Sequence, residues 1–308
     1  MHSGRTPHSC ARNGQRAVVV LLLLLLSSCL SLQNLYRASR AVRTAENIAY
    51  IDDGDDKHKL NVFAPAGAQG APVVVFVHGG FWRAGDRSYH ESIVGLYGNV
   101  GTALADNDVV TVVPSYRLYP QVPSAEDMLD DVAAALAWTR DHIAVHGGDP
   151  QRILLAGHSA GAHLVTLLAS RPDALRKRGI DPSVIKGVVS LSGIYDVPGA
   201  AARAELEEDR VTLWRPLFGK LGAEQSPARY FGDKMAPIFF VVGSNDFESC
   251  LVDYHAAEKS LAGLVGDRAF FRTLPKLTHE DMVLTIGTAH DDVGPAVAAF
   301  AWFITRRP

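Results

Sequence analysis

The feature that most constrains the fold of this chain is an apolar run, Ile153 to Gly157, that continues into the pattern G-x-S-x-G. The run has the length of a buried strand, and the apolar segment behind it keeps helical spacing until Arg171-Pro172 ends it. Glycines on either side of the central serine, Ser159, let neighbouring backbone approach a sharp turn between strand and helix. The pattern therefore predicts a serine hydroxyl held out at the carboxyl end of a sheet, which is the position of a nucleophile.

Short apolar runs alternate with helical patterns along the rest of the chain, and this alternation predicts an α/β fold with a mostly parallel sheet and helices on both faces. Ser124 and Asp127 form a capping box at the start of one of these helices. Alternating residues on both sides of an aspartate-rich turn predict an antiparallel edge hairpin from 47–51 and 59–63. Further strands are expected over 73–77, 109–113, 184–191, 238–242 and 269–274, and helices over 250–264 and 293–304.

One segment, Ile194 to Ala236, is too long for an ordinary connection between two strands. Long insertions of this kind are commonly lids or binding loops, so we expect a small cap here, with a solvated surface excursion as the alternative. The segment contains the charged run Glu205 to Arg210 and the aromatic residues Trp214, Phe218, Tyr230 and Phe231.

The amino end has the pattern of a targeting segment. Arg12 and Arg16 precede an apolar run, Ala17 to Leu26, that leads into Ser27-Ser28-Cys29. We interpret 1–33 as an export signal or membrane anchor, with lipidation of Cys29 as one route to membrane attachment, 34–43 as a tether, and 44–308 as the catalytic domain. The expected location is exported or membrane-associated: a cell-envelope lipoprotein in a bacterium, or a secretory-pathway membrane in a eukaryote.

Composition narrows the function classes. The 308 residues carry a formal net charge of -3 and are 47% hydrophobic, so the chain can bury a large core and lacks the basic excess of a nucleic-acid-binding protein. The three cysteines, Cys10, Cys29 and Cys250, are far apart and match no metal-ligand spacing. Neither a zinc site nor a disulfide framework is expected.

A serine hydroxyl is a weak nucleophile at neutral pH, so Ser159 requires a histidine base and a carboxylate that orients this base. In a strand-turn-helix context the acid and then the histidine follow the serine, each in a loop after a later strand. Asp246 follows the run 238–242, and His279 follows the run 269–274. We therefore assign Asp246 as the acid and His279 as the base.

Other acidic and histidine residues remain as alternatives or receive structural roles. Glu248 is the alternative acid, and His290 is the alternative base. Asp253 lies within the helix expected over 250–264 and is interpreted as a surface charge. Packing or capping roles are expected for His158, His163 and His255.

Attack on a carbonyl also requires N–H donors for the oxyanion that forms. The loop His78-Gly79-Gly80-Phe81-Trp82 follows the strand expected over 73–77, where an H-G-G-G-type motif supplies such donors. The residue directly after the serine supplies another. The oxyanion hole is therefore assigned to Gly79, Gly80, Phe81 and Ala160.

Several motifs together resemble a known family. They are the His78 to Trp82 loop, Tyr116 to Pro120, Ser124 to Asp131, His146 to Pro150, Gly157 to Gly161, Gly243 to Asp246 and Thr278-His279. From about Tyr50 to Phe303 the sequence resembles the α/β-hydrolase fold, and within it the carboxylesterases with an H-G-G-x-W loop. It is most similar to isoprenylcysteine methylesterases, kynurenine formamidases and small acyl esterases.

The resemblance implies an esterase with the triad Ser159, Asp246 and His279, whose oxyanion hole uses the N–H groups of Gly80 and Phe81. Phe81 replaces a glycine of the H-G-G-G pattern, so a benzyl group is expected to flank the hole. The expected function is hydrolysis of a carboxylic ester of a small or lipophilic substrate through an acyl-enzyme, with no metal or organic cofactor. An arylformamidase is the alternative enzyme, and a non-catalytic binding protein on the same scaffold is the alternative outside enzymes.

Overall fold

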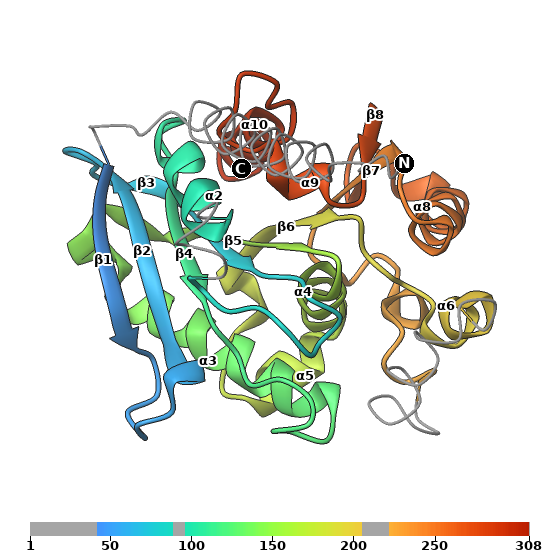
Figure 1. Ribbon diagram of the computed structural model, residues 1–308, viewed down its shortest axis with the longest axis horizontal. Coiled ribbons are helices and arrows are strands. Elements are labelled where there is room, and N and C mark those ends of the chain that lie inside the picture. The colour runs from blue at the N-terminus through green and yellow to red at the C-terminus, as the bar shows by residue number, and fades with distance from the viewer. Residues whose placement is uncertain (1–41, 89–95, 205–221, 308) are drawn as a thin grey trace, which may run out of the picture. The chain divides into compact units, whose positions relative to one another are not determined.

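A computed structural model describes residues 42–88, 96–204 and 222–307 (Figure 1). The leader predicted over 1–33, most of the predicted tether, and the residues Glu205 to Arg210, Trp214 and Phe218 lie outside these ranges. Among the helices in the described ranges, none combines the length and the apolar character that a bilayer crossing requires.

The strands and helices of the described ranges are as follows. The strands are β1 Val42–Ala49, β2 Lys59–Pro65, β3 Ala71–Val77, β4 Val110–Pro114, β5 Gly148–His158, β6 Ile185–Leu191, β7 Ile238–Asn245 and β8 Ala269–Thr278. The α-helices are α2 Leu96–Ala105, α3 Ala125–His142, α4 Ala160–Ser170, α5 Pro172–Lys177, α6 Val197–Ala204, α8 Glu248–Ser260, α9 Asp281–Leu284 and α10 Val293–Ile304.

In this part of the chain the strands form one sheet in the order β1-β2-β4-β3-β5-β6-β7-β8. The pairings from β4 to β8 are parallel, whereas β1 pairs antiparallel with β2, and β2 antiparallel with β4. The predicted mostly parallel sheet and its edge hairpin are confirmed. The hairpin begins earlier than expected, because β1 starts at Val42 and takes in the last residues assigned to the tether.

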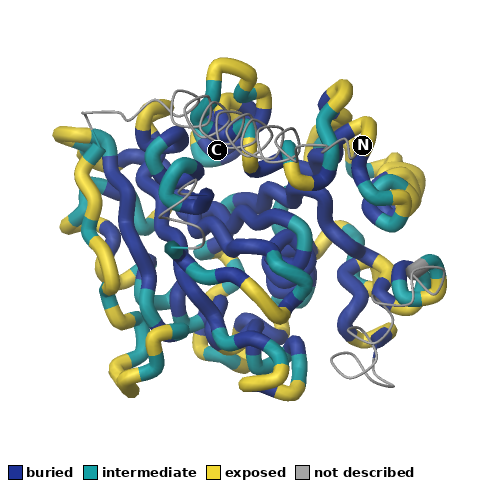
Figure 2. The backbone as a smooth tube through the Cα atoms, viewed as in Figure 1, coloured by how far each residue is buried: buried dark blue, intermediate teal, exposed yellow. Residues whose placement is uncertain are grey.

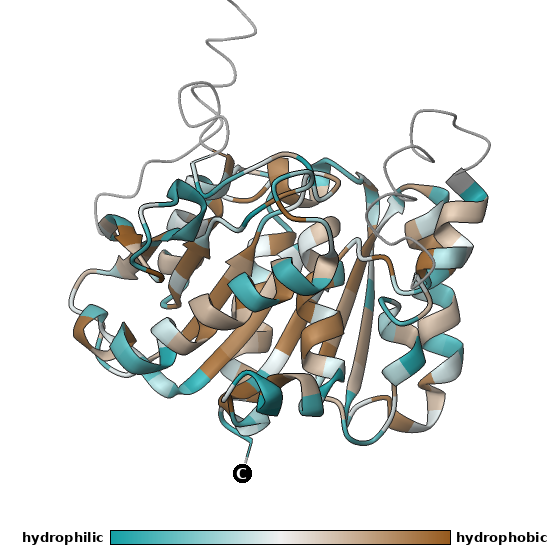
Figure 3. Cartoon of the chain, turned by 90° about the horizontal axis from the view of Figure 1, so that it is seen from below, coloured by the Kyte–Doolittle hydropathy of each residue, from teal (hydrophilic) through white to brown (hydrophobic). Residues whose placement is uncertain are grey.

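Alternate residues of the central strands enter two separate cores, one on each face of the sheet. On β3, Val73, Val75 and Val77 belong to a core shared with α3, α4 and α8. Val74 and Phe76, which point the other way, belong to a core shared with α2, α9 and α10. In Figure 1, α9 and α10 lie above the strands and α3 and α5 below them. Burial on both faces explains why these strands are continuous apolar runs, dark blue in Figure 2 and brown in Figure 3.

Capping residues and proline set several of the helix ends. Ser124 is the N-cap of α3, and its side chain accepts a hydrogen bond from the N–H of Asp127. Helix α4 ends at Ser170, and Pro172 starts α5, because proline lacks the N–H that would continue α4. The helix expected over 250–264 is shorter than predicted, since α8 ends at Ser260.

Candidate active site

The predicted site residues follow strands whose carboxyl ends meet at one edge of the sheet. The His78 loop follows β3, Ser159 follows β5, Asp246 follows β7 and His279 follows β8. These strands are mutually parallel within the order β3-β5-β6-β7-β8, so their carboxyl ends point the same way. Residues that are up to 201 positions apart in the sequence are brought to one edge of the sheet by this topology.

Ser159 occupies a strained turn between β5 and α4. Its backbone has φ 55° and ψ -119°, a conformation that costs a non-glycine residue about 1–3 kcal/mol. The neighbouring glycines make this turn possible: a Cβ on Gly157 would lie 2.5 Å from the backbone of Gly161, and a Cβ on Gly161 would lie 2.1 Å from the backbone oxygen of Val77. The N–H of Ser159 donates to the backbone oxygen of Leu191 at 2.9 Å, which ties the turn to β6.

His279 and Asp246 form a buried pair. The Nδ1 of His279 lies 2.7 Å from the Oδ1 of Asp246, and both side chains are shielded from solvent. The ring of Phe247 stacks on the imidazole at a centroid distance of 4.2 Å. Because stacking and hydrogen bond act on one ring, its orientation is fixed from two directions.

The charge on Asp246 determines which nitrogen of His279 carries the proton. Burial alone would raise the pKa of Asp246, but hydrogen bonds from the His279 ring, the Ser192 hydroxyl and the Phe247 N–H outweigh it and lower the pKa. An ionised carboxylate accepts hydrogen bonds and donates none, so the neutral imidazole is protonated on Nδ1. The lone pair of Nε2 is then available to accept a proton.

The acid and base predicted from the sequence are thus brought together, and the alternatives are not part of this pair. Glu248 is exposed at the start of α8, and His290 is exposed in the turn between α9 and α10. Ser192, whose hydroxyl donates to Asp246, was not predicted as part of the site. The available signal was its position directly after β6, at the same sheet edge.

The His78 loop has an unusual backbone and a buried histidine. Gly80, Phe81 and Trp82 have φ values of 116°, 53° and 57°. The Nδ1–H of His78 donates to the Gly79 oxygen at 2.8 Å, and burial lowers the pKa of His78 to about 4, so this ring is neutral and structural. The assignment of Gly79 to the oxyanion hole is corrected, because its N–H donates to the Tyr97 hydroxyl at 3.2 Å.

The sequence matches the family described as "Carboxylesterase family" over residues 27–212, which is more than half of the chain. The chain belongs to the carboxylesterase family.

Relatives of this carboxylesterase-family chain include a probable isoprenylcysteine α-carbonyl methylesterase of Arabidopsis thaliana, 34% identical over 257 residues that make up 80% of this chain and 51% of the relative. The kynurenine formamidase of Drosophila melanogaster is 30% identical over 155 residues, 50% of this chain and 47% of the relative. The chain spans about half or less of the length of the curated methylesterases that it matches. Esterase B from Lactobacillus rhamnosis has the same fold, with a TM-score of 0.73 at 19% identity and 95% coverage of each chain.

The segment that follows the His78 loop in this carboxylesterase-family chain is anchored by Arg87, a buried residue that was not predicted from the sequence. Its guanidinium donates to the side-chain oxygen of Asn47 at 2.6 Å and to the backbone oxygen of Asp56 at 2.9 Å. The backbone N–H of Arg87 donates to the Ser115 hydroxyl at 2.9 Å. These bonds tie the segment around Arg87 to the β1-β2 hairpin and so restrain the position of the adjoining loop, which carries the candidate oxyanion-hole residues.

The expected packing roles of two histidines are confirmed. His158 donates from Nε2 to the backbone oxygen of His279 at 2.9 Å, and His163 donates from Nε2 to the backbone oxygen of Gln225 at 2.7 Å. Burial lowers the pKa of His158 to about 3 and that of His163 to about 4, so both rings are neutral. His255 lies on α8 and is exposed.

The interpretation of Asp253 as a surface charge is wrong. Asp253 is only 2% exposed. Its carboxylate accepts hydrogen bonds from the N–H groups of Tyr195 and Asp196 at 2.6 and 2.8 Å. It also accepts one from the Arg203 guanidinium at 2.5 Å. The start of the long insertion, with α6, therefore folds over α8. The two ends of the insertion also meet, because the N–H of Ala228 donates to the Tyr195 oxygen at 3.0 Å.

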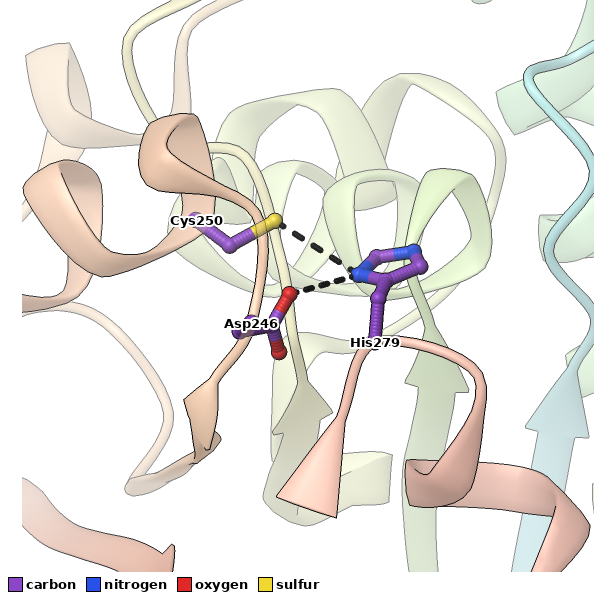
Figure 4. A group of neighbouring side chains, drawn as sticks. All are labelled: Asp246, Cys250 and His279. Atoms are coloured by element: carbon purple, nitrogen blue, oxygen red, sulfur yellow. Dashed lines mark hydrogen bonds and ion pairs between the residues drawn. The ribbon is translucent and has the colours of Figure 1, made fainter. Parts of the chain in front are cut away.

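Cys250, in the first turn of α8, lies beside the candidate acid and base (Figure 4). Its Sγ is 3.8 Å from the Nδ1 of His279 and 3.4 Å from the backbone oxygen of Ser192, which accepts from the thiol. Sequence reasoning noted this cysteine only as distant from the other two. The available signal was its position in the first turn of the helix that follows Asp246.

Proposed function

We propose that this chain hydrolyses a carboxylic ester through an acyl-enzyme on Ser159. The observation that carries the proposal is the buried His279–Asp246 pair, 2.7 Å apart, at the same sheet edge as a serine held at φ 55° directly after β5. A strained serine and an imidazole oriented by a carboxylate, both at one edge of the sheet, are the groups that nucleophilic acyl transfer requires.

In the proposed reaction the Ser159 Oγ attacks the ester carbonyl, and the Nε2 of His279 accepts the hydroxyl proton. The oxyanion is bound by the N–H groups of Gly80, Phe81 and Ala160. The tetrahedral intermediate expels the alcohol, which takes the proton from Nε2. Water then attacks the acyl-enzyme by the same route and releases the acid, while Asp246 remains ionised and stabilises the imidazolium in both steps.

The proposed substrate class is a small-molecule ester with a small or lipophilic group. The names of the plant relatives refer to a methylesterase of an isoprenylated cysteine, which supports a methyl ester or a lipophilic acyl group. The proposed mechanism requires neither a metal nor an organic cofactor, and the composition gives no support for nucleic acid as a partner.

Arylformamide hydrolysis is the second candidate. Its support is the similarity to the Drosophila kynurenine formamidase, and the same serine, base and oxyanion donors would cleave a formyl C–N bond. A non-catalytic binding protein on this scaffold is a third possibility, which the test below separates from both enzymes.

Labelling with a fluorophosphonate probe tests the serine mechanism, and a substrate panel separates the two activities. The full chain is expected to be labelled and to hydrolyse at least one ester among methyl, acetyl and feruloyl substrates faster than N-formylkynurenine. Ser159→Ala should lose labelling and turnover with an unchanged unfolding midpoint, because it removes one hydroxyl from a half-buried turn. Ester hydrolysis within tenfold of wild type in Ser159→Ala would refute the mechanism.

We also propose that residues 1–33 direct export and membrane retention, with a tether over 34–43 ahead of a catalytic domain over 44–308. Support comes from Arg12 and Arg16, the apolar run that follows and the Ser27-Ser28-Cys29 ending. Removing 1–33 should move the activity from the membrane fraction to the soluble fraction without loss of specific activity. An inactive or insoluble truncated chain would contradict this division.

A further inference from the structure

The most unusual group of side chains near the site combines a thiol, an imidazole and a carboxylate. Cys250, His279 and Asp246 each direct one potential metal ligand towards the others, and these atoms all lie within 4.8 Å of one another. They come from the first turn of α8, the residue after β8 and the residue after β7 (Figure 4). All three residues are buried, with exposures of 2%, 6% and 8%. Water therefore competes weakly with these side chains as a ligand of a cation held between them.

The chemistry of these donors favours a borderline or soft divalent cation. Thiolate and imidazole ligands with one carboxylate are typical of tetrahedral Zn²⁺, and Cd²⁺ binds the same donors, whereas Mg²⁺ and Ca²⁺ prefer oxygen ligands. In a tetrahedral site the sulfur and nitrogen ligands lie about 3.5 Å apart, close to the 3.8 Å between Cys250 and His279. The 2.7 Å between Asp246 and His279 would open by about 0.7 Å, which a side-chain rotation supplies.

We propose that Cys250, Asp246 and His279 form an inhibitory site for Zn²⁺ and cations of the same class. The inhibition rests on the function proposed above, whereas the binding of the cation does not. Of the three ligands, Cys250 alone has no part in the proposed reaction. Its thiol would supply the third ligand and so complete a metal site with the acid–base pair.

Occupation of this site stops the proposed reaction through the His279 ring. The cation binds the lone pair of Nδ1, so the ring proton moves to Nε2 through solvent. Nε2 then carries a proton and cannot accept one from Ser159. The Cys250 thiol loses its proton to solvent and becomes a thiolate, so binding releases one proton and involves no oxidation or reduction.

The activity test uses the full chain in a Cys10→Ser/Cys29→Ser background, so that Cys250 is the remaining thiol. Zn²⁺ should inhibit ester hydrolysis equally in this background and in the wild type, EDTA should reverse the inhibition, and Mg²⁺ at the same concentration should have no effect. Adding Cys250→Ala should leave the metal-free rate within about twofold and raise the zinc concentration for half-inhibition at least tenfold. Equal zinc sensitivity with and without Cys250 would overturn the proposal.

A binding measurement separates this proposal from the proposed function. Cd²⁺ added to the Cys10→Ser/Cys29→Ser chain should produce the ultraviolet charge-transfer absorption of a cadmium thiolate, and His279→Ala should weaken this binding at least tenfold. No such absorption, or binding unchanged by His279→Ala, would overturn the metal site. A chain that hydrolyses no ester but shows His279-dependent cadmium absorption would refute the proposed function and leave the metal site standing.

Discussion

The residue before the candidate nucleophile holds the loop that carries the candidate base: the Nε2 of His158 lies 2.9 Å from the backbone oxygen of His279. Burial lowers the pKa of His158 to about 3, so its ring is neutral and donates this hydrogen bond rather than carrying charge. The two imidazoles lie 4.6 Å apart between centroids. The turn at Ser159 and the loop at His279 are thereby joined directly.

We predict that His158→Ala lowers kcat about ten- to a hundredfold with little change in KM, because the loop bearing His279 loses its anchor. His158→Gln should recover much of the rate, since its amide N–H can donate to the same backbone oxygen. Steady-state kinetics of both variants, with their unfolding midpoints, provide the check. A glutamine variant as slow as the alanine variant would show that ring packing matters more than the hydrogen bond.

Asp246→Asn should lower kcat by on the order of 10³- to 10⁴-fold, because a neutral amide no longer selects the imidazole tautomer protonated on Nδ1. Glu248→Gln is the matched control: it lies two residues away, is exposed, and should stay within about twofold of wild type. Comparing kcat for the two variants tests the assignment. A larger loss in Glu248→Gln would mean that the acid has been misplaced.

Asp253→Asn should destabilise the fold by about 2–4 kcal/mol, since it removes the partner of Arg203 and places an NH2 group among backbone N–H donors. The free energy of unfolding from a urea titration measures this loss. Glu258→Gln, an exposed change on the same helix, should alter it by less than about 0.5 kcal/mol. Equal effects of the two changes would contradict the buried contacts of Asp253.

Acid should destabilise the fold through its buried histidines, His78, His158 and His163. Burial lowers their pKa values to about 4, 3 and 4, whereas an unfolded histidine titrates near about 6.5. Below this value the unfolded chain takes up protons that the folded chain does not, so their stabilising contribution is complete above about pH 6.5 and is lost as the pH falls towards 4.

The variant His163→Gln isolates one of these terms, because its amide can still donate to the Gln225 oxygen but does not titrate. Between pH 8 and pH 5 its free energy of unfolding should fall by roughly 2 kcal/mol less than that of wild type. Denaturant titrations at several pH values measure the difference. Parallel curves for the two proteins would show that folding does not change the pKa of His163.

The sheet and the order of its loops were predictable because each central strand is a continuous apolar run and the G-x-S-x-G turn fixes one strand-to-helix junction. Helix α2 was not predicted. Its ten residues contain Gly98 and Gly101, which lower helix propensity, and packing on the strand residue Phe63 stabilises it instead. Such tertiary support leaves no local signal.

Within the site, Asp246 and His279 follow predicted strands, and their spacing along the chain sufficed to identify them. Asp253 was misjudged because its partners come from the insertion 50 to 58 residues earlier, and the burial of a charge on a helix is evident only when that segment is in place. Ser192 and Cys250 were not predicted as part of the site for a related reason. Each acts through a contact across the sheet edge, and neither belongs to a motif.

The hydrogen bond between Ala228 and Tyr195 closes the long insertion at its base, while Asp253 and His163 hold the two ends from α8 and α4. The described parts of the segment, 194–204 and 222–236, are thus attached to α8 and α4, whereas Ser159 and His279 lie on other loops. A change in these parts therefore need not move Ser159 or His279, so the insertion can vary among homologous chains while the arrangement of these two residues stays the same.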